Sequence, residues 1–349
     1  HAPAAELAAP AGGQAPLPLR RATFRRRSLR KEELPTPSSI GGSTVSSISA
    51  DSLAERVPTP LSCGSPPHRA RDRGSTRCPE LAAGTTWKRG SKIGSGSYGS
   101  VFTALSDRGQ IFAVKQAMLG DSESDRRFLD NLEDELAICK GLRHPNIVSY
   151  LGHDYIGSEL YIYLEYVPGG SMSSILKEFG PLEAKPLKLA TRGVLEGLEY
   201  LHSRSPPVVH RDIKGANLLV DLTFQVKLAD FGCSKRCVDT RSLSTVGSVP
   251  WMAPEVINQQ EGHGRKADVW SLGCTVIEMA TAEKPWGDGA FDNVLFAMRR
   301  IGMTEETPPV PEACDDTLRS FVEACTRRDP KSRPSARQAL HHDFAISAG

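Results

Sequence analysis

The sequence has no hydrophobic run long enough to cross a membrane and no dense framework of cysteines. Its longest mostly apolar stretch, residues 269–282, is shorter than the roughly 20 residues of a spanning helix and contains Glu278, so we expect a buried helix. Eight cysteines are scattered over 349 residues. That spacing is typical of reduced thiols and unlike a small secreted domain, so we expect a cytoplasmic protein with possible access to the nucleus. The net charge of +2 gives no reason to expect nucleic-acid binding.

Aromatic residues are nearly absent from the first part of the chain. Phe24 is the only Phe, Tyr or Trp in residues 1–86, where 12 basic residues stand against 7 acidic ones. A segment of this composition cannot bury enough apolar surface to offset its conformational entropy, so we predict a disordered basic tail. Because residue 1 is His, we also expect the chain to be truncated or processed.

From Trp87 onward the sequence has the pattern of a folded domain. Runs rich in β-forming residues predict strands at residues 88–93, 101–104, 111–115, 147–151, 160–166 and 218–220. Apolar residues at helical spacing predict helices at residues 125–142, 187–201, 265–281, 293–301, 317–326 and 335–340. The Pro168-Gly169-Gly170 break between the strand-rich and helix-rich parts is a natural hinge.

Two short motifs carry the clearest chemistry. Residues 210–217 are His-Arg-Asp-Ile-Lys-Gly-Ala-Asn, and Asp230-Phe231-Gly232 follows closely. Together they supply two carboxylates (Asp212 and Asp230), the ammonium group of Lys214 and the amide oxygen of Asn217. Phosphate transfer from a metal–nucleotide needs one carboxylate to orient the attacking hydroxyl, and an amide and a second carboxylate to hold magnesium. An Asp-rich surface turn would match all four positions only by accident, so we favour phosphate transfer.

A glycine-rich segment precedes these motifs at Gly94-Ser95-Gly96-Ser97-Tyr98-Gly99. Its glycines would allow backbone amides to approach phosphate oxygens, although dinucleotide-binding proteins use the same spacing and an ordinary hairpin turn would also fit. A dinucleotide-binding loop opens a helix. Residues 100–103 favour a strand instead, so a dinucleotide-dependent enzyme is the weaker hypothesis.

Lys115 ends the strand-like run Phe112-Ala113-Val114 and could reach nucleotide phosphates if a carboxylate neutralised it. We choose Glu135 as that partner and Glu133 as the alternative, since the predicted helix leaves Glu135 near its inward face. For either glutamate, a salt bridge on a solvated helix face remains open.

These motifs, in this order, resemble those of protein kinases over residues 87–344. Lys214 resembles serine/threonine kinases, and residues 166–171, 210–220 and 247–255 are most similar to MAP kinase kinase kinases. The resemblance implies an α+β, two-lobed fold with a small β-rich lobe containing one main helix (residues 87–166), a larger helical lobe (residues 171–344) and a tail at residues 345–349. It also implies ATP and Mg²⁺ as cofactors and a MAP kinase kinase as protein substrate.

The same resemblance assigns roles to individual residues. Asp212 and Lys214 would act on the reacting groups, Lys115 and Glu135 would position the phosphates, and Asn217 and Asp230 would bind the metal. The ATP-binding residues would be Ile93, Gly94, Ser95, Gly96, Ser97, Tyr98, Gly99, Val101, Lys115, Glu165 and Val167.

Regulation and architecture are implied as well. Arg211 resembles the arginine that receives a phosphate from the activation segment, where the candidate sites are Ser242, Ser244 and Thr245. That phosphate would come from an upstream kinase or from self-phosphorylation. Residues with expected structural roles are Ser248 (usually Thr, aligning Asp212), Asp268 (bracing the 210–217 loop) and the ion pair of Glu255 with Arg333.

A kinase-shaped scaffold that binds signalling partners without catalysis is the alternative hypothesis. Such pseudokinases typically lack at least one essential residue. Lys115, Asp212, Asn217 and Asp230 are all present in this sequence, which argues against it.

Overall fold

The structure is a computed structural model, and it describes residues 81, 85–96, 99–118, 136, 139–156, 159–230, 248–258, 264–287, 291, 293–311 and 314–346. The chain divides into two units, residues 1–52 and 53–349, and every described residue belongs to the second. Most of the predicted basic tail, residues 1–86, therefore lies outside the described residues.

Ordered contacts begin slightly before Trp87, where we had placed the domain boundary. Leu81 packs against the cluster around Trp87, and Thr85 is buried. The Thr86 backbone N–H and Oγ1 donate to Asp107 Oδ2 at 3.2 and 3.1 Å. These three residues thus belong with the sheet rather than with the tail.

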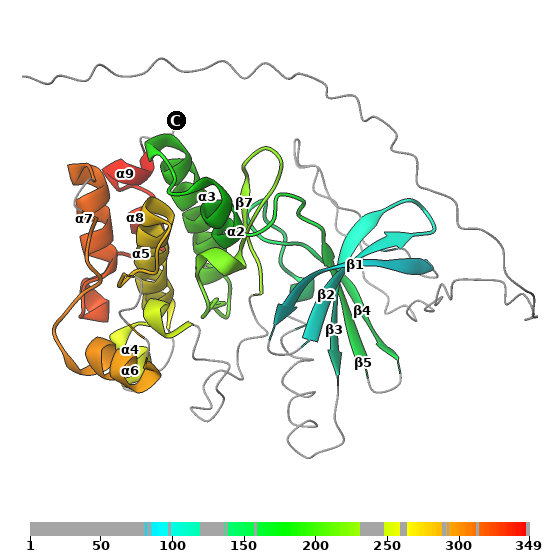
Figure 1. The fold of residues 1–349 in the computed structure, drawn as a ribbon, viewed down its shortest axis with the longest axis horizontal. Helices are drawn as coiled ribbons and strands as arrows, with labels where there is room; N and C mark the ends of the chain where they lie inside the picture. The colour runs from blue at the N-terminus through cyan, green and yellow to red at the C-terminus, as the bar shows by residue number, and fades with distance from the viewer. Residues whose placement is uncertain are drawn as a thin grey trace, which may run out of the picture. The chain divides into compact units, whose positions relative to one another are not determined.

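Five strands form one antiparallel sheet in the order β1-β2-β3-β5-β4 (Figure 1). They are β1 Trp87–Gly96, β2 Gly99–Ser106, β3 Ile111–Met118, β4 Tyr150–Ile156 and β5 Glu159–Glu165. One face packs around Trp87, whose ring centroid lies 6.0 Å from Phe112 and 5.9 Å from Tyr163, both edge-on. Such edge-to-face aromatic contacts add to the free energy gained by burying the rings, so this cluster holds the strands together.

One predicted strand is misplaced. We expected a strand at residues 147–151, but β4 begins at Tyr150 and continues to Ile156. Ile147 instead forms a parallel bridge with Leu228, and the Val148 N–H donates to the Leu228 carbonyl at 2.9 Å. Of the helix predicted at residues 125–142, Leu136, Cys139 and Lys140 are described and helical, with Leu136 and Cys139 buried.

The hinge needs glycine for steric reasons. A Cβ atom on Gly169 would lie 2.3 Å from the carbonyl oxygen of Val220, and Gly170 has a φ of +80°. Few side chains fit such a close approach or such a backbone angle. The hinge therefore lies directly against the short hairpin that follows the 210–217 loop.

The chain after the hinge is mostly helical. Its helices are α2 Met172–Phe179, α3 Ala184–His202, α4 Pro254–Ile257, α5 Arg265–Thr281, α6 Val294–Met303, α7 Asp316–Cys325, α8 Ala336–Ala339 and α9 Asp343–Ile346. Two 3₁₀ turns, η1 Gly215–Asn217 and η4 Pro330–Ser332, and the hairpin of β6 Leu218–Val220 with β7 Val226–Leu228 complete it. The α+β class predicted from the sequence is confirmed.

Helix α5 is the centre of the helical part and packs against α3 and α7 (Figure 1). Every residue from Ala267 to Met279 is buried, the carboxylates of Asp268 and Glu278 included. Its bounds match the predicted helix. Asn293 and Ser335, predicted as the first residues of two other helices, are instead the caps whose side chains accept hydrogen bonds from α6 and α8.

A buried ion pair fastens the start of α4 to the segment before α8. The Arg333 guanidinium donates to both carboxylate oxygens of Glu255, at 2.7 and 2.8 Å. Its other three donor positions reach the carbonyl oxygens of Arg327, Lys266 and Arg328 at 2.6, 2.9 and 3.0 Å. All five N–H groups are therefore satisfied, which a buried arginine requires.

Replacing Arg333 with alanine should lower the free energy of unfolding by about 3–5 kcal/mol, because the Glu255 carboxylate would be left buried and unpaired. The matched control is Arg337→Ala: the Arg337 side chain is 77% exposed and pairs with Glu199 at the surface, so its removal should cost at most about 1 kcal/mol. Urea unfolding of both variants measures the difference. Equal losses would contradict a special role for the buried pair.

Candidate active site

The 210–217 loop is held from behind by one carboxylate of α5. Asp268 is fully buried, and its Oδ2 and Oδ1 accept the backbone N–H groups of His210 and Arg211, each at 2.8 Å. His202 Nε2, at the end of α3, lies 2.8 Å from Oδ2. Arg211 has a φ of +73°, a conformation that costs energy in a non-glycine residue. The two hydrogen bonds to Asp268 hold the backbone in that conformation.

His210 connects this loop to the segment that carries Asp230. Its ring is fully buried, Nδ1 accepts the Asp212 N–H at 3.3 Å, and Nε2 lies 3.1 Å from the Ala229 carbonyl oxygen. Since a carbonyl oxygen only accepts, the proton lies on Nε2 and the ring is neutral. Burial lowers the pKa of His210, and attraction by Asp268 and other carboxylates opposes the shift only in part.

Two of the predicted site residues, Lys214 and Asn217, bond directly to Asp212, and a third, Ser248, is joined to it through Lys214. Its Oδ2 accepts hydrogen bonds from Lys214 Nζ at 2.8 Å and from Asn217 Nδ2 at 2.7 Å. Asn217 Nδ2 also donates to the Asp212 carbonyl oxygen at 2.8 Å, and Lys214 Nζ donates to Ser248 Oγ at 2.6 Å. Oδ1 of Asp212 makes no hydrogen bond among the residues that the structure describes. The arrangement therefore fixes a carboxylate with one oxygen available to a ligand.

Lys115 on β3 reaches across to Asp230. Lys115 Nζ lies 2.7 Å from Asp230 Oδ1, and the lysine side chain is only 11% exposed against 49% for the aspartate. The Lys115 charge is the main reason that the pKa of Asp230 is lowered, so this carboxylate is ionised. Glu135 and Glu133, the partners predicted for Lys115, lie outside the described residues.

The glycine-rich segment is the tip of the β1–β2 hairpin. Gly96 pairs with Gly99, while Ser97 and Tyr98 lie outside the described residues. A Cβ atom on Gly99 would be 1.8 Å from the carbonyl oxygen of Gln116 on β3, so only glycine fits there. A strand follows the loop, as we expected, and this rules out the helix-opening loop of a dinucleotide-binding fold.

The residues predicted to bind adenine lie at the end of β5. Glu165 is tied down by its side chain, which pairs with Lys227 at 2.9 Å and accepts the Ser149 N–H at 3.0 Å. Val167 is buried, yet its N–H and C=O make no hydrogen bond within the described part of the chain. Backbone groups without a protein partner can bond to a ligand, which is what the predicted nucleotide contact requires. The other predicted nucleotide contacts, Ile93, Gly94, Ser95 and Val101, lie along β1 and β2.

The donor set suits a hard divalent cation. Both hydrogen bonds of the Asn217 side chain leave from Nδ2, so Oδ1 is available as an oxygen ligand. Asp230 offers an ionised, half-exposed carboxylate at the same end of the β6–β7 hairpin, where the Ala229 N–H donates to the Asn217 carbonyl at 2.9 Å. Oxygen ligands of this kind are those that Mg²⁺ prefers. No group of three or more His, Cys, Asp or Glu side chains that could hold a metal occurs among the described residues.

Two residues that matter here were missed from the sequence. Glu278 on α5 is buried and accepts hydrogen bonds from the Gly215 N–H, Ser173 Oγ and Trp251 Nε1 at 2.9, 2.8 and 3.0 Å. Burial raises the pKa of Glu278, and these three donors oppose the shift. His202, which holds Asp268, is the other. A glutamate within an otherwise apolar stretch was a visible sign of Glu278, whereas nothing in the sequence distinguishes His202.

Several predicted sites cannot be placed. Ser242, Ser244 and Thr245 lie outside the described residues, as do Phe231 and Gly232. Arg211, their expected partner, is described, and its guanidinium has no hydrogen bond or ion pair with any described residue.

Within the part of the chain that the structure describes, no helix is long and apolar enough to span a membrane.

Residues 87–345 match the family described as Protein kinase domain, and the chain belongs to this family. The resemblance drawn from the sequence motifs is therefore confirmed, together with the two-lobed fold that it implied.

Its relatives include several proteins named as mitogen-activated protein kinase kinase kinases. The chain is 43% identical to mitogen-activated protein kinase kinase kinase A of Dictyostelium discoideum over 75% of its length, which is 28% of that protein. It is 41% identical to mitogen-activated protein kinase kinase kinase 3 of Arabidopsis thaliana (74% of this chain, 42% of that protein). Identity to mitogen-activated protein kinase kinase kinase 19 of Mus musculus is 43% (74% of this chain, 20% of that protein). The chain thus spans less than half the length of each of these relatives.

The buried His210 should make the protein less stable in mild acid. In the unfolded chain its imidazole binds a proton near the ordinary pKa of 6.5, whereas the folded state keeps it neutral to lower pH. The free energy of unfolding should therefore fall as the pH drops below about 6.5, with His210 contributing up to about 1.4 kcal/mol per pH unit. His144 and His153 have pKa values lowered by burial and add to the same trend.

Urea unfolding between pH 7.5 and 5.5 measures this slope. In His210→Gln, whose amide can still donate to the Ala229 carbonyl, the slope should be shallower than in the unmodified protein. His341→Gln, at an exposed position, is the matched control and should leave the slope unchanged. An unchanged slope in His210→Gln would contradict the assignment.

Proposed function

We propose that this chain is an ATP-dependent serine/threonine protein kinase of the MAP kinase kinase kinase type, which phosphorylates a MAP kinase kinase. The observation that carries the proposal is the cluster around Asp212, in which Lys214 and Asn217 fix one carboxylate oxygen and leave the other available. This arrangement can orient a hydroxyl group and neutralise a phosphate at the same point, as phosphate transfer to a side-chain hydroxyl requires.

Each residue of the cluster has a defined task. Asp212 Oδ1 accepts the hydrogen bond of the substrate hydroxyl and orients its oxygen toward the phosphate. Lys214, which donates to both Asp212 Oδ2 and Ser248 Oγ, places a positive charge beside the transferred group. Because Ser248 belongs to the segment before α4, its bond to Lys214 ties the substrate-binding side of the site to the 210–217 loop. Lysine at this position is typical of kinases that act on serine or threonine.

ATP is the phosphate donor in this proposal, with Mg²⁺ held by Asn217 Oδ1 and Asp230. The ion supplies charge neutralisation at the phosphates when it is bound. The backbone groups of Val167 bind the adenine edge, and the β1–β2 hairpin covers the phosphates through its glycines. Lys115 reaches the phosphates from β3, with Glu135 as its partner on the predicted helix.

The substrate class follows from the relatives rather than from the site. Proteins that share 41–43% of residues with this chain over its kinase domain are named for action on a MAP kinase kinase. A site for serine or threonine hydroxyls agrees with such a substrate. We place the protein in the cytoplasm, in keeping with its described cysteines at positions 139, 274, 314 and 325, which are free thiols.

A catalytically silent scaffold is not favoured. The side chains that a pseudokinase lacks are present, and Asp212, Lys214 and Asn217 are connected by hydrogen bonds in one cluster. Lys115 is likewise aimed at the metal-binding Asp230.

Replacing Asp212 with asparagine should lower kcat for phosphate transfer to a MAP kinase kinase by about 10² to 10⁴, because the group that orients the hydroxyl is lost. Binding of a fluorescent ATP analogue should stay within a few-fold, since Asp212 does not contact the nucleotide. Asp316→Asn, an exposed aspartate at the start of α7, is the matched control and should leave kcat unchanged. An unchanged kcat in Asp212→Asn would contradict the proposal that Asp212 orients the substrate hydroxyl.

Phosphorylation of Ser244 or Thr245 should switch the enzyme on by pairing with Arg211, which has no partner among the described residues. A double-mutant cycle tests this: Arg211→Ala and the combined Ser244→Ala, Thr245→Ala variant should each lower kcat. All three changes together should be no worse than either alone, because they remove the same ion pair. Additive losses, or mass spectra that show an unmodified segment in the active form, would count against it.

A further inference from the structure

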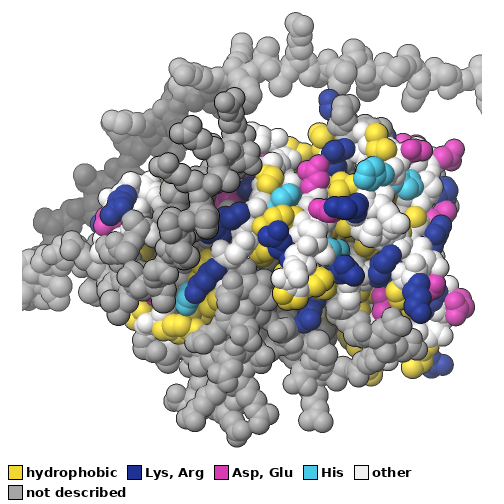
Figure 2. All heavy atoms as spheres, turned by 180° about the vertical axis from the view of Figure 1, so that it is seen from behind, with side chains coloured by type: hydrophobic (Ala, Val, Ile, Leu, Met, Phe, Trp, Pro, Cys, Tyr) yellow, Lys and Arg dark blue, Asp and Glu magenta, His cyan; other side chains and the backbone are white. Residues whose placement is uncertain are grey.

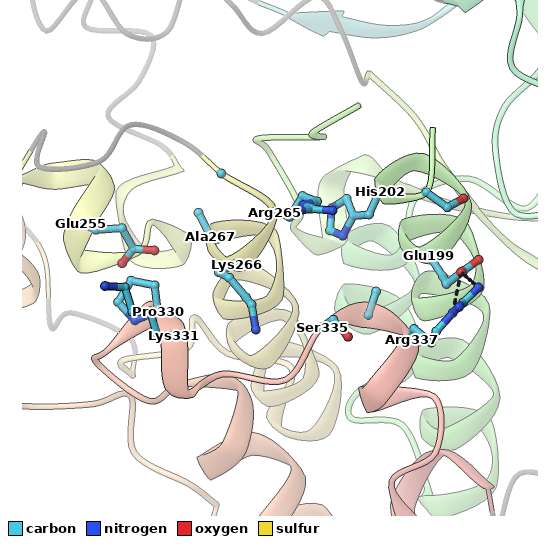
Figure 3. A pocket seen from close by; sticks show the side chains of 13 residues that line it. Glu199, His202, Glu255, Arg265, Lys266, Ala267, Pro330, Lys331, Ser335 and Arg337 are labelled. Carbon is cyan, nitrogen blue, oxygen red and sulfur yellow. Dashed lines mark hydrogen bonds and ion pairs between the residues drawn. The ribbon is translucent and has the colours of Figure 1, made fainter. Parts of the chain in front are cut away.

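Within the described part of the chain, one buried carboxylate of α5 is not paired with a cation. On the face of the molecule shown in Figure 2, acidic side chains lie at the surface, several of them next to Lys or Arg. Near the start of α5, the two carboxylates at a cavity of about 660 Å³ are also paired (Figure 3). Glu199 lies 3.1 Å from Arg337, and Glu255 lies 2.7 Å from Arg333. Glu278, near the other end of the helix, is only 7% exposed and forms no ion pair with any residue that the structure describes.

Hydrogen bonds from three separate segments take the place of a cation at Glu278. Its Oε2 accepts the Gly215 N–H at 2.9 Å and the Trp251 indole N–H at 3.0 Å. Its Oε1 accepts the Ser173 hydroxyl at 2.8 Å. These donors belong to the 210–217 loop, to the segment before α4 and to α2. An N–H group can only donate, so Oε2 is the acceptor that the first two donors require.

The contact with Gly215 leaves no room for a side chain at that position. A Cβ atom on Gly215 would lie 2.7 Å from Ser173 Oγ and 2.8 Å from Glu278 Cδ. Such distances are well inside van der Waals contact, so glycine is needed here for a steric reason. Glu278 therefore lies directly against the backbone of the loop that carries Asp212.

The other N–H donor belongs to the Trp251 segment, which we define as residues 248–251. Two hydrogen bonds attach the backbone of this segment to α5 and to the chain that follows α5. The Trp286 indole donates to the Pro250 carbonyl oxygen at 3.0 Å, and Ser271 Oγ donates to the Trp251 carbonyl oxygen at 2.8 Å. The segment is thus well fixed to the helical part of the chain.

Two further connections join the Trp251 segment to the 210–217 loop. One is the bond of 2.6 Å from Lys214 Nζ to Ser248 Oγ. The other runs from the Trp251 indole through Glu278 Oε2 to the Gly215 N–H. Because a single oxygen accepts both N–H groups, a movement of either segment relative to the other must lengthen one of these bonds.

We propose that Glu278 is a positioning residue for phosphate transfer, which sets the Trp251 segment, and the protein substrate bound along it, at a fixed place relative to Asp212. This inference rests on the proposed function, because it takes the segment before α4 as the substrate-binding side. Glu278 touches neither the substrate nor the nucleotide. It acts as a hydrogen-bond acceptor that two segments share, and its charge is not needed for that task.

The first test compares two variants that each remove one donor from the same carboxylate. Trp251→Phe should raise the KM for a MAP kinase kinase about tenfold, the usual effect of losing one hydrogen bond to a charged group. Its kcat and its KM for ATP should stay within about twofold, since Asp212 and the nucleotide contacts are retained. Ser173→Ala is the matched control and should change none of these constants, because α2 does not hold the substrate.

Steady-state kinetics of the full chain, with thermal melting of each variant, measure these effects. An unchanged KM in Trp251→Phe would overturn the proposal. So would equal increases of KM in Trp251→Phe and Ser173→Ala, because they would assign Glu278 a purely structural role.

The second test is rescue by the conservative variant Glu278→Gln. The amide oxygen can accept both N–H groups in place of Oε2, and the amide NH₂ then faces Ser173, whose hydroxyl can accept as well as donate. Burial raises the pKa of Glu278, so a neutral group suits this position. Glu278→Gln should therefore keep kcat and both KM values within about twofold. A large rise of KM in a Glu278→Gln protein that melts like the unmodified one would overturn the proposal.

Amide hydrogen exchange tests the same contact without any substrate. Peptides that cover residues 248–253 should exchange faster in Trp251→Phe than in the unmodified protein, and at an unchanged rate in Ser173→Ala. Equal exchange in both variants would overturn the proposal. If the unmodified chain transferred no phosphate to a MAP kinase kinase, the proposed function would fail, whereas faster exchange in Trp251→Phe alone would still support Glu278 as the link between the two segments.

Discussion

The geometry of the site depends on one buried carboxylate. Asp268, on the central helix α5, accepts the backbone N–H groups of His210 and Arg211 and contacts His202. Arg211 has a left-handed backbone conformation that costs energy in a non-glycine residue, and the hydrogen bonds to Asp268 stabilise it. The His210 ring then connects the loop to the Asp230 segment, because it is hydrogen-bonded to both the Asp212 N–H and the Ala229 carbonyl oxygen. Asp212 and the segment of Asp230 are therefore both positioned by the buried helix α5.

Much of the site could be predicted from the sequence because most of its members are close together in it. Asp212, Lys214 and Asn217 lie within a single loop, and the combination of a carboxylate, an ammonium group and an amide indicates phosphate transfer. The pairing of Lys115 with Asp230 spans 115 residues and depends on how β3 meets the β6–β7 hairpin, which no local pattern encodes. His202 and Glu278 were missed for the same reason. Each acts through partners distant in sequence, and a histidine or glutamate near a helix end has many ordinary uses.

Helices and strands were likewise predicted well where neighbouring residues determine them, and less well where partners far along the chain do. Helix α5 was predicted with its observed bounds because an apolar run ended by turn residues fixes both ends. The start of β4 was misplaced because Ile147 and Val148 have strand propensity but pair with Leu228, far along the chain. Helix α2 was missed because its eight residues follow the hinge directly, and glycine and serine there favour turns as much as a helix cap.

The burial of α5 also bears on which sequence changes the protein can tolerate. The residues on either side of Asp268 pack on all faces, so the position of its carboxylate is set by the volume of side chains far from any reacting group. A substitution that shifts this helix by a fraction of an ångström need not unfold the chain, yet it moves the support of the loop that carries Asp212. Changes at the core positions of α5 are therefore expected to alter the position of the 210–217 loop as well as the stability of the fold.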